Sequence, residues 1–103
     1  MICDNITAAA NGHLLFAGQD TVALAKQYGT PLYLMDEDRI RENCRVYTAA
    51  FRKHFGGRAR PLYASKALSC KRINDIMREE DMRIDVLSSC EIYTALQPGY
   101  HQS

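Results

Sequence analysis

The sequence lacks several features that would point to particular protein classes. No stretch approaches the roughly 20 apolar residues of a membrane span. The start, residues 1–5, has neither the positive flank nor the apolar run of a signal peptide. The four cysteines form no Cys-x-x-Cys pair, and the three histidines complete no zinc spacing. These absences predict a cytoplasmic protein without a metal site or membrane contact, whose thiols are reduced and buried.

The sequence also lacks an excess of positive or negative charge. Thirteen Lys and Arg residues stand against twelve Asp and Glu residues, and the two signs are interspersed along the chain. Nucleic-acid binding usually needs a basic patch, so no nucleic-acid partner is expected. The length of 103 residues allows at most one small domain.

The N-terminal third predicts a short lead-in. Its first dozen residues are polar and read as irregular up to the turn dipeptide Asn11-Gly12. Residues 14–16 are apolar and predict a short strand. Asp20 is then expected to cap a short helix that ends at the Gly29-Thr30-Pro31 signal.

The strongest periodic signal is a helix that opens at Asp36 and stops at Gly56-Gly57. Acidic residues fill its first turn and basic residues its last, as the helix dipole favours. Its apolar residues recur at helical spacing and are expected to be buried; they are Ile40, Cys44, Tyr47 and Phe51. We expect the three arginines of this helix to form a solvated face; they are Arg39, Arg41 and Arg45.

The remaining sequence repeats a strand–helix pattern. Strands are predicted at 60–64 and 82–87, with a turn at 65–68 after the first of them. Ser69 is expected to cap a helix whose buried stripe is Ile73, Ile76 and Met77. A second helix is predicted from about 89 to 96, ended by Pro98-Gly99. This order implies parallel strands joined by a right-handed crossover, which is α/β architecture. Two such units cannot close a barrel, so a truncated piece of a larger fold is expected.

Lys66 is the candidate catalytic residue, because it follows the C-terminal end of a predicted strand, where α/β folds place catalytic groups. Strand alternation puts Leu62, Ala64 and Lys66 on one face. A Schiff-base lysine needs a neutral amine, which a crowded, desolvated site favours. Most lysines are solvated surface residues, so position alone favours that alternative.

Three motifs occur in order along the chain. Tyr63-Ala64-Ser65-Lys66-Ala67 resembles the Tyr-Ala-x-Lys-Ala box of the fold type III, alanine-racemase-like decarboxylases that use pyridoxal 5′-phosphate (PLP). Residues 28–43 are similar to the early segment of diaminopimelate decarboxylases. Asp85-Val86-Leu87-Ser88 with Glu91 resembles that family's Asp-Val-x-Ser-x-x-Glu stretch.

The resemblance implies that Lys66 holds PLP as an internal aldimine and that Asp85, Ser88 and Glu91 lie around the cofactor. Two alternatives stay open for these residues. Ser88 and Glu91 also read as a capping box that starts a helix. Asp85 is equally explained by a bond to Arg83 or to a backbone amide. One departure is Ser89-Cys90, where the family usually has two glycines, and side chains there are expected to crowd the site.

The resemblance further implies a PLP-binding (β/α)₈ TIM barrel, of which residues 1–103 would be the N-terminal fragment. Within it, 1–35 would be a lead-in strand and short helix, and 36–103 the first helix and two βα units. The implied reaction converts meso-diaminopimelate, a small amino-acid substrate, to L-lysine and carbon dioxide in a homodimer. The alternatives are a noncatalytic PLP-binding or interaction remnant, and an ornithine, arginine or carboxynorspermidine decarboxylase fragment.

Overall fold

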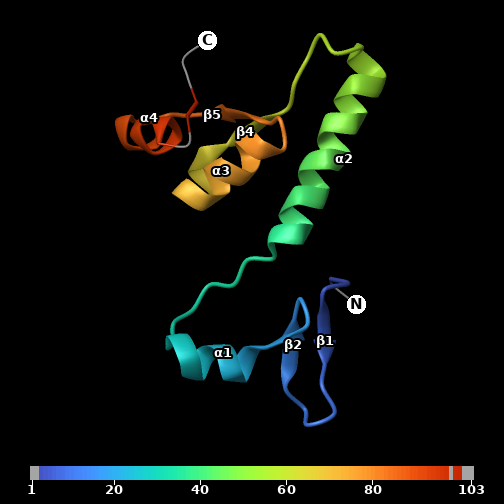
Figure 1. The fold of residues 1–103 in the computed structure, drawn as a ribbon, viewed down its shortest axis with the longest axis vertical. Helices are drawn as coiled ribbons and strands as arrows, with labels where there is room; N and C mark the ends of the chain where they lie inside the picture. The colour runs from blue at the N-terminus through green and yellow to red at the C-terminus, as the bar shows by residue number, and fades with distance from the viewer. Residues whose placement is uncertain (1–2, 98, 101–103) are drawn as a thin grey trace. The chain divides into compact units, whose positions relative to one another are not determined.

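The computed structural model describes residues 3–97 and 99–100, which form a mixed α/β structure. They divide into two compact units, Met1–Glu37 and Asp38–Ser103. Figure 1 shows the helices and strands of each unit. Within the described part of the chain, no helix is both long and apolar enough to cross a membrane. The predicted helix stop at Pro98 lies outside the described residues.

The first unit contains a small antiparallel sheet. Its strands are β1 (Ile6–Ala8), β2 (Leu14–Phe16) and β3 (Gln19–Asp20), in that order across the sheet. The strand predicted at 14–16 is confirmed. The prediction of an irregular first dozen residues was wrong, because β1 pairs with β2 and places Thr7 opposite Leu15. That pairing depends on a partner strand and leaves little trace in the polar local sequence.

Helix α1 (Thr21–Tyr28) follows the sheet directly and begins as the sequence predicts. The Asp20 side chain accepts hydrogen bonds from the backbone amides of Val22 and Ala23, at 2.8 and 3.2 Å. His13 contacts the other carboxylate oxygen of Asp20 at 2.8 Å, and this hydrogen bond is the main reason that the pKa of Asp20 is lowered. The cap is therefore an ionised carboxylate at a helix N-terminus, which is stabilising.

The second unit is built on two parallel strands, β4 (Leu62–Ala64) and β5 (Arg83–Asp85). Helix α3 (Lys71–Glu79) connects them, and helix α4 (Ser89–Leu96) follows β5 (Figure 1). The predicted parallel strand–helix–strand–helix order is thus confirmed. The predicted cap at Ser69 was wrong: Cys70 occupies the N-cap position, and its side chain makes no capping hydrogen bond.

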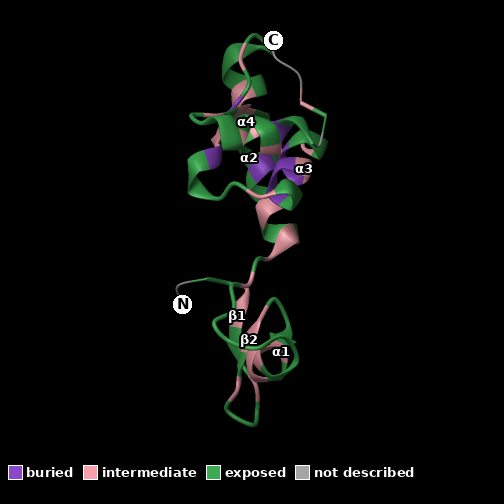
Figure 2. Cartoon of the chain, turned by 90° about the vertical axis from the view of Figure 1, so that its left-hand side faces the viewer, coloured by how far each residue is buried: buried purple, intermediate pink, exposed green. Residues whose placement is uncertain are grey.

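Helix α2 (Glu37–Phe55) packs its side chains on α3 and the strands. Figure 2 shows the buried residues gathered in the second unit. The buried hydrophobic core residues are Cys44, Ile73, Ile76, Met77, Met82 and Ala95, which confirms the predicted α3 stripe. Cys44, Ile73, Met77 and Met82 form one cluster, with Ile40, Tyr63, Cys70 and Ile84 packed against it.

Two members of the predicted α2 stripe, Tyr47 and Phe51, do not belong to the core cluster. Tyr47 is 60% exposed, whereas Thr48 is half-buried and lies 3.8 Å from the Met82 sulfur. The reason is helix geometry, because residues 44 and 48 lie nearly in line and α2 contacts its neighbours along a narrow seam. Phe51 is half-buried and packs on Phe55 with ring centroids 5.4 Å apart.

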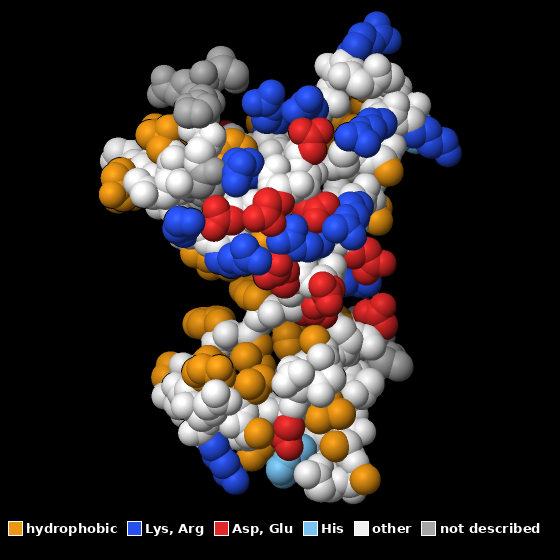
Figure 3. All heavy atoms as spheres, viewed as in Figure 1, with side chains coloured by type: hydrophobic (Ala, Val, Ile, Leu, Met, Phe, Trp, Pro, Cys, Tyr) orange, Lys and Arg blue, Asp and Glu red, His pale blue; other side chains and the backbone are white. Residues whose placement is uncertain are grey.

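Arg41 and Arg45 of α2 bind acidic residues at the C-terminal end of α3, rather than forming a simple solvated face. Arg39 pairs with Glu42 of its own helix at 2.8 Å on the exposed side. Arg41 contacts Glu79 at 2.6 Å and Glu80 at 3.0 Å. Arg45 donates two hydrogen bonds to Glu80, at 2.8 and 2.9 Å. The hydrogen bond from Arg45 is the largest cause of a lowered pKa for Glu80, and the hydrogen bond from Arg41 lowers that pKa further. Figure 3 shows the resulting mixture of acidic and basic side chains on this face of the second unit.

All four thiols are free. Cys44 is buried and donates a hydrogen bond to the Met77 sulfur at 3.6 Å, and burial raises its pKa. The prediction of buried thiols is right for Cys44 and wrong for Cys3 and Cys90, which are exposed.

Asn74 is a buried polar residue without a visible partner. Its side chain is fully buried in α3, and neither amide atom has a hydrogen-bond partner within the described residues. Leucine has the same number and branching of non-hydrogen side-chain atoms. We expect Asn74→Leu to raise the free energy of unfolding by about 1–2 kcal/mol, because an unsatisfied buried group is removed. Urea denaturation followed by circular dichroism measures the change.

The matched control is Asn43→Leu at an exposed position of α2. It is expected to leave stability within about 0.5 kcal/mol of the parent. A loss of stability in Asn74→Leu would contradict the prediction and show that the amide has a polar partner in solution.

Candidate active site

Lys66 lies on a single turn of 3₁₀-helix, η1 (Ser65–Ala67), directly after β4. Its side chain is exposed. The strand ends at Ala64, so strand alternation does not extend to Lys66, and the turn predicted at 65–68 is present. The crowded surroundings expected for a Schiff-base lysine are not found around Lys66 in this structure.

Two side-chain hydrogen bonds flank the turn. At its first residue, the Ser65 hydroxyl donates to Oε2 of Glu91 at 3.0 Å. After it, the Tyr63 hydroxyl donates to the backbone carbonyl of Leu68 at 3.0 Å. Burial is the main cause of a raised pKa for Tyr63, which keeps its hydroxyl available as a donor. The backbone that carries Lys66 is therefore tied at both ends.

Glu91 links the ends of the two strands. Its Oε2 also accepts a hydrogen bond from the backbone amide of Leu87 at 2.7 Å. This amide is the largest cause of a lowered pKa for Glu91, followed by the Ser65 hydroxyl, and the charge of Lys66 acts in the same direction. These interactions favour the carboxylate form of Glu91.

The helix-start interpretation of Ser88 and Glu91 is correct in part. Ser88 is the N-cap of α4, and its hydroxyl accepts from the Glu91 amide at 3.2 Å. In a capping box the Glu91 side chain would bind the amide of Ser88 in return. The Ser88 amide does contribute to the lowered pKa of Glu91, but the 2.7 Å hydrogen bond of the carboxylate comes from the amide of Leu87, one residue earlier. The same oxygen accepts from Ser65.

Asp85 ends β5 directly opposite Ala64 of β4. It is exposed, and no hydrogen bond or ion pair joins it to another residue of the described chain. Both local explanations of Asp85, a bond to Arg83 or to a backbone amide, were therefore wrong. The parallel register brings this carboxylate to the same strand end as the Lys66 turn.

The structure thus joins Glu91 to the turn that bears Lys66, and it adds a residue to which sequence reasoning gave no role. Ser65 is fully buried and provides the link. Its place beside the lysine in the motif is visible in the sequence, but its partner lies 26 residues away. Ser89 and Cys90, expected to crowd the site, are both exposed in the first turn of α4.

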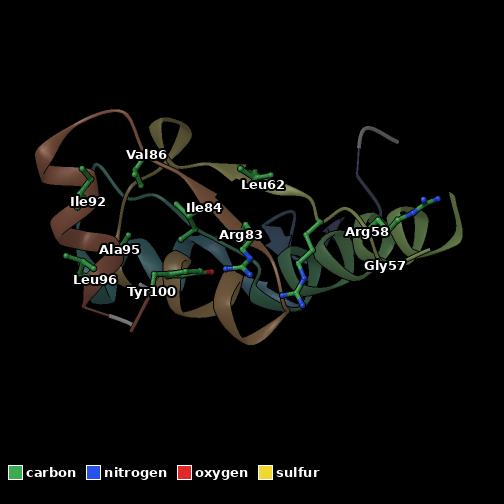
Figure 4. A pocket seen from close by; sticks show the side chains of 11 residues that line it. Gly57, Arg58, Leu62, Arg83, Ile84, Val86, Ile92, Ala95, Leu96 and Tyr100 are labelled. Atoms are coloured by element: carbon green, nitrogen blue, oxygen red, sulfur yellow. The ribbon is translucent and has the colours of Figure 1, made fainter. Parts of the chain in front are cut away.

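A separate cavity of about 550 Å³ lies along the two strands and α4. Its lining includes the apolar side chains of Leu62, Ile84 and Ile92 and the guanidinium of Arg83 (Figure 4). Tyr100 closes one side, and its hydroxyl donates to the Met82 carbonyl at 3.0 Å. The lining does not include Lys66, Asp85 or Glu91, so the cavity and the lysine turn are distinct places.

Comparison with known proteins finds diaminopimelate decarboxylases among the relatives of this chain. The diaminopimelate decarboxylase of Methanothermobacter thermautotrophicus is 48% identical over 89 residues, covering 86% of this chain and 21% of that protein. The chain is homologous to a segment of diaminopimelate decarboxylase. The diaminopimelate decarboxylase of Bacillus methanolicus is 44% identical, over 86% of this chain and 20% of the relative. The chain spans about a fifth of the length of these curated relatives.

Solved structures agree with the sequence relatives. The crystal structure of diaminopimelate decarboxylase from M. jannaschii in complex with L-lysine superimposes with a TM-score of 0.78 and 30% identity. The match covers 92% of this chain and 22% of that diaminopimelate decarboxylase chain. No protein-family model matches the chain.

Proposed function

We propose that this chain carries the cofactor lysine of a PLP-dependent diaminopimelate decarboxylase, and that Lys66 is that lysine. The observation that carries the proposal is the placement of Lys66. It stands on a turn tied at both ends, at the C-terminal end of a parallel strand, in a segment homologous to diaminopimelate decarboxylase. The C-terminal ends of parallel strands are where such folds gather catalytic groups.

The residues at this place suit an aldehyde cofactor. Lys66 offers an exposed primary amine on a fixed backbone, and alanines on both sides of the Ser65-Lys66 pair leave room for a flat ring. Asp85, at the end of the neighbouring strand, offers a carboxylate that has no hydrogen bond or ion pair with another described residue. We propose that Asp85 contacts the cofactor or substrate, whereas Ser88 and Glu91 act by holding the turn and the start of α4.

PLP, when bound, supplies the electron sink that lets the substrate α-carbon lose carbon dioxide. The chain's own contribution is to hold the backbone turn that bears the Lys66 amine, through the Ser65 hydroxyl and the Glu91 carboxylate. The substrate assigned by the proposal is meso-diaminopimelate and the product L-lysine. Support for this substrate comes from the names of the homologues and from the L-lysine bound in the M. jannaschii structure.

The wider setting is part of the same proposal. Residues 36–103 would be the first helix and two βα units of a (β/α)₈ barrel domain, with 1–35 leading into it. The protein would act in the cytoplasm as a homodimer on a small amino-acid substrate. The TM-score of 0.78 supports the barrel, and the four free thiols accord with a reducing compartment.

Absorption spectroscopy tests whether Lys66 is the residue that takes up PLP. Adding an equal amount of PLP to the purified protein is expected to give an imine absorption band that is shifted from the band of free PLP, and Lys66→Ala is expected to lose this shifted band. Lys53→Ala, at an exposed site on α2, is the matched control and should keep the band. Equal bands in the parent and in Lys66→Ala would contradict the assignment.

A further inference from the structure

We propose that Ser65 is a positioning residue that, through Glu91, fixes the orientation of the turn bearing Lys66. The inference rests on the proposed function, because its effect is measured on the reaction of Lys66 with an aldehyde. It adds Ser65 to the site and gives Glu91 a definite task.

Ser65 has the features of a residue built for a single contact. Its side chain is fully buried, although it immediately precedes an exposed lysine. Its hydroxyl donates to Oε2 of Glu91 at 3.0 Å. Ala64, the N-cap of η1, has no side-chain cap bond, so the start of this short turn has no local side-chain anchor. The Ser65 hydroxyl provides that anchor across 26 residues of sequence.

Glu91 is a rigid acceptor for this hydroxyl. The same Oε2 atom receives the Leu87 amide at 2.7 Å, which holds the carboxylate against the segment between β5 and α4. The Glu91 backbone amide is in turn bound by the capping hydroxyl of Ser88. Glu91 therefore holds the turn after β4 in a fixed position relative to the segment after β5.

The second tie explains why the anchor acts on Lys66 in particular. The Tyr63 hydroxyl holds the Leu68 carbonyl, so the ties at Ser65 and Leu68 enclose Lys66 and Ala67. A lysine side chain has many rotamers, and fixing its backbone reduces the conformations from which the amine must reach its target. Loss of one tie lets the turn rock, and the amine then samples orientations that do not lead to reaction.

The reaction used as a probe is chemically simple. The Lys66 amine attacks the PLP aldehyde carbon, a C=N bond forms, and the aldehyde oxygen leaves as water. Borohydride then adds hydride to the carbon of that bond, and the nitrogen takes a proton from solvent. The pyridoxyl group remains attached to the lysine as a secondary amine. Peptide mapping gives the ratio of label on Lys66 to label on exposed Lys53, which serves as an internal standard.

Four variants of the full chain test the proposal. Ser65→Ala and Glu91→Ala are each expected to lower the Lys66:Lys53 label ratio by about threefold to tenfold, which corresponds to the loss of one typical intramolecular hydrogen bond. The double variant is expected to have the same label ratio as Glu91→Ala alone, because both substitutions remove the same hydrogen bond between Ser65 and Glu91. Glu91→Gln is expected to restore most of the ratio, since one amide oxygen can accept both bonds that Oε2 now accepts.

Ser69→Ala is the control, because Ser69 is an exposed serine in the segment that follows the turn. Circular dichroism establishes that each variant is folded. A folded Ser65→Ala chain with the parent ratio overturns the positioning role while leaving the proposed function intact. If Ser65→Ala does not fold, equal ratios in Glu91→Gln and Glu91→Ala overturn the role. No preference for Lys66 in the parent refutes the proposed function itself.

Discussion

The purified 103-residue chain, supplied with excess PLP, is expected to release no carbon dioxide from carboxyl-labelled meso-diaminopimelate above the level of its Lys66→Ala variant. The reason is the surroundings of Lys66. Its side chain is exposed, and the sheet that carries it has two strands. Electrostatic stabilisation of a developing charge needs preorganised groups in a site that excludes water. An open two-stranded sheet provides neither, although its lysine can still react with an aldehyde.

A diaminopimelate decarboxylase relative assayed in parallel is the positive control, and trapped radioactive carbon dioxide is the readout. Release that depends on both Lys66 and PLP would contradict the expectation. It would mean that an enclosed site assembles from these 103 residues, for example by association of several copies.

Replacing Ile76 with alanine is expected to lower the free energy of unfolding of the second unit by about 3 kcal/mol. Ile76 is 2% exposed and is among the largest fully buried side chains in the described part of the chain. Truncation removes three carbons from a small core and leaves a cavity that the neighbouring helices can fill only partly. Small domains have little stability to lose, so much of the population is expected to unfold.

The matched control for Ile76→Ala is Val46→Ala on α2, where the side chain is 62% exposed. It is expected to change stability by less than about 0.5 kcal/mol. Urea denaturation followed by circular dichroism compares the two variants. Similar losses in both would show that burial of Ile76 does not stabilise the unit as the structure indicates.

Local signals in the sequence predicted most of the second unit and the helix start in the first unit. The helix from 89 to 96, the strand at 62–64 and the cap at Asp20 depend on neighbouring residues, and all three are present in the structure. Parallel pairing followed from the connection length and is confirmed. The match of these elements to diaminopimelate decarboxylase was carried by short motifs around Lys66 and Asp85.

Contacts between distant residues could not be predicted in the same way. Strand β1 exists because β2 lies beside it, and Arg45 pairs with Glu80 because α2 and α3 meet. Ser65 is a variable position of the lysine motif, and the sequence does not indicate its hydrogen bond to Glu91, which lies 26 residues away. Each case depends on which faces come together in three dimensions, and periodicity specifies a face without specifying its partner.

The most direct test of the central claim is to locate the PLP attachment site in the purified protein. PLP is added, the product is reduced with borohydride, and the pyridoxyl group is located by peptide mapping and mass spectrometry. The proposed function predicts that the label lies predominantly on Lys66, within the peptide that contains Tyr63-Ala64-Ser65-Lys66-Ala67. Label predominantly on Lys26, Lys53 or Lys71 would contradict it.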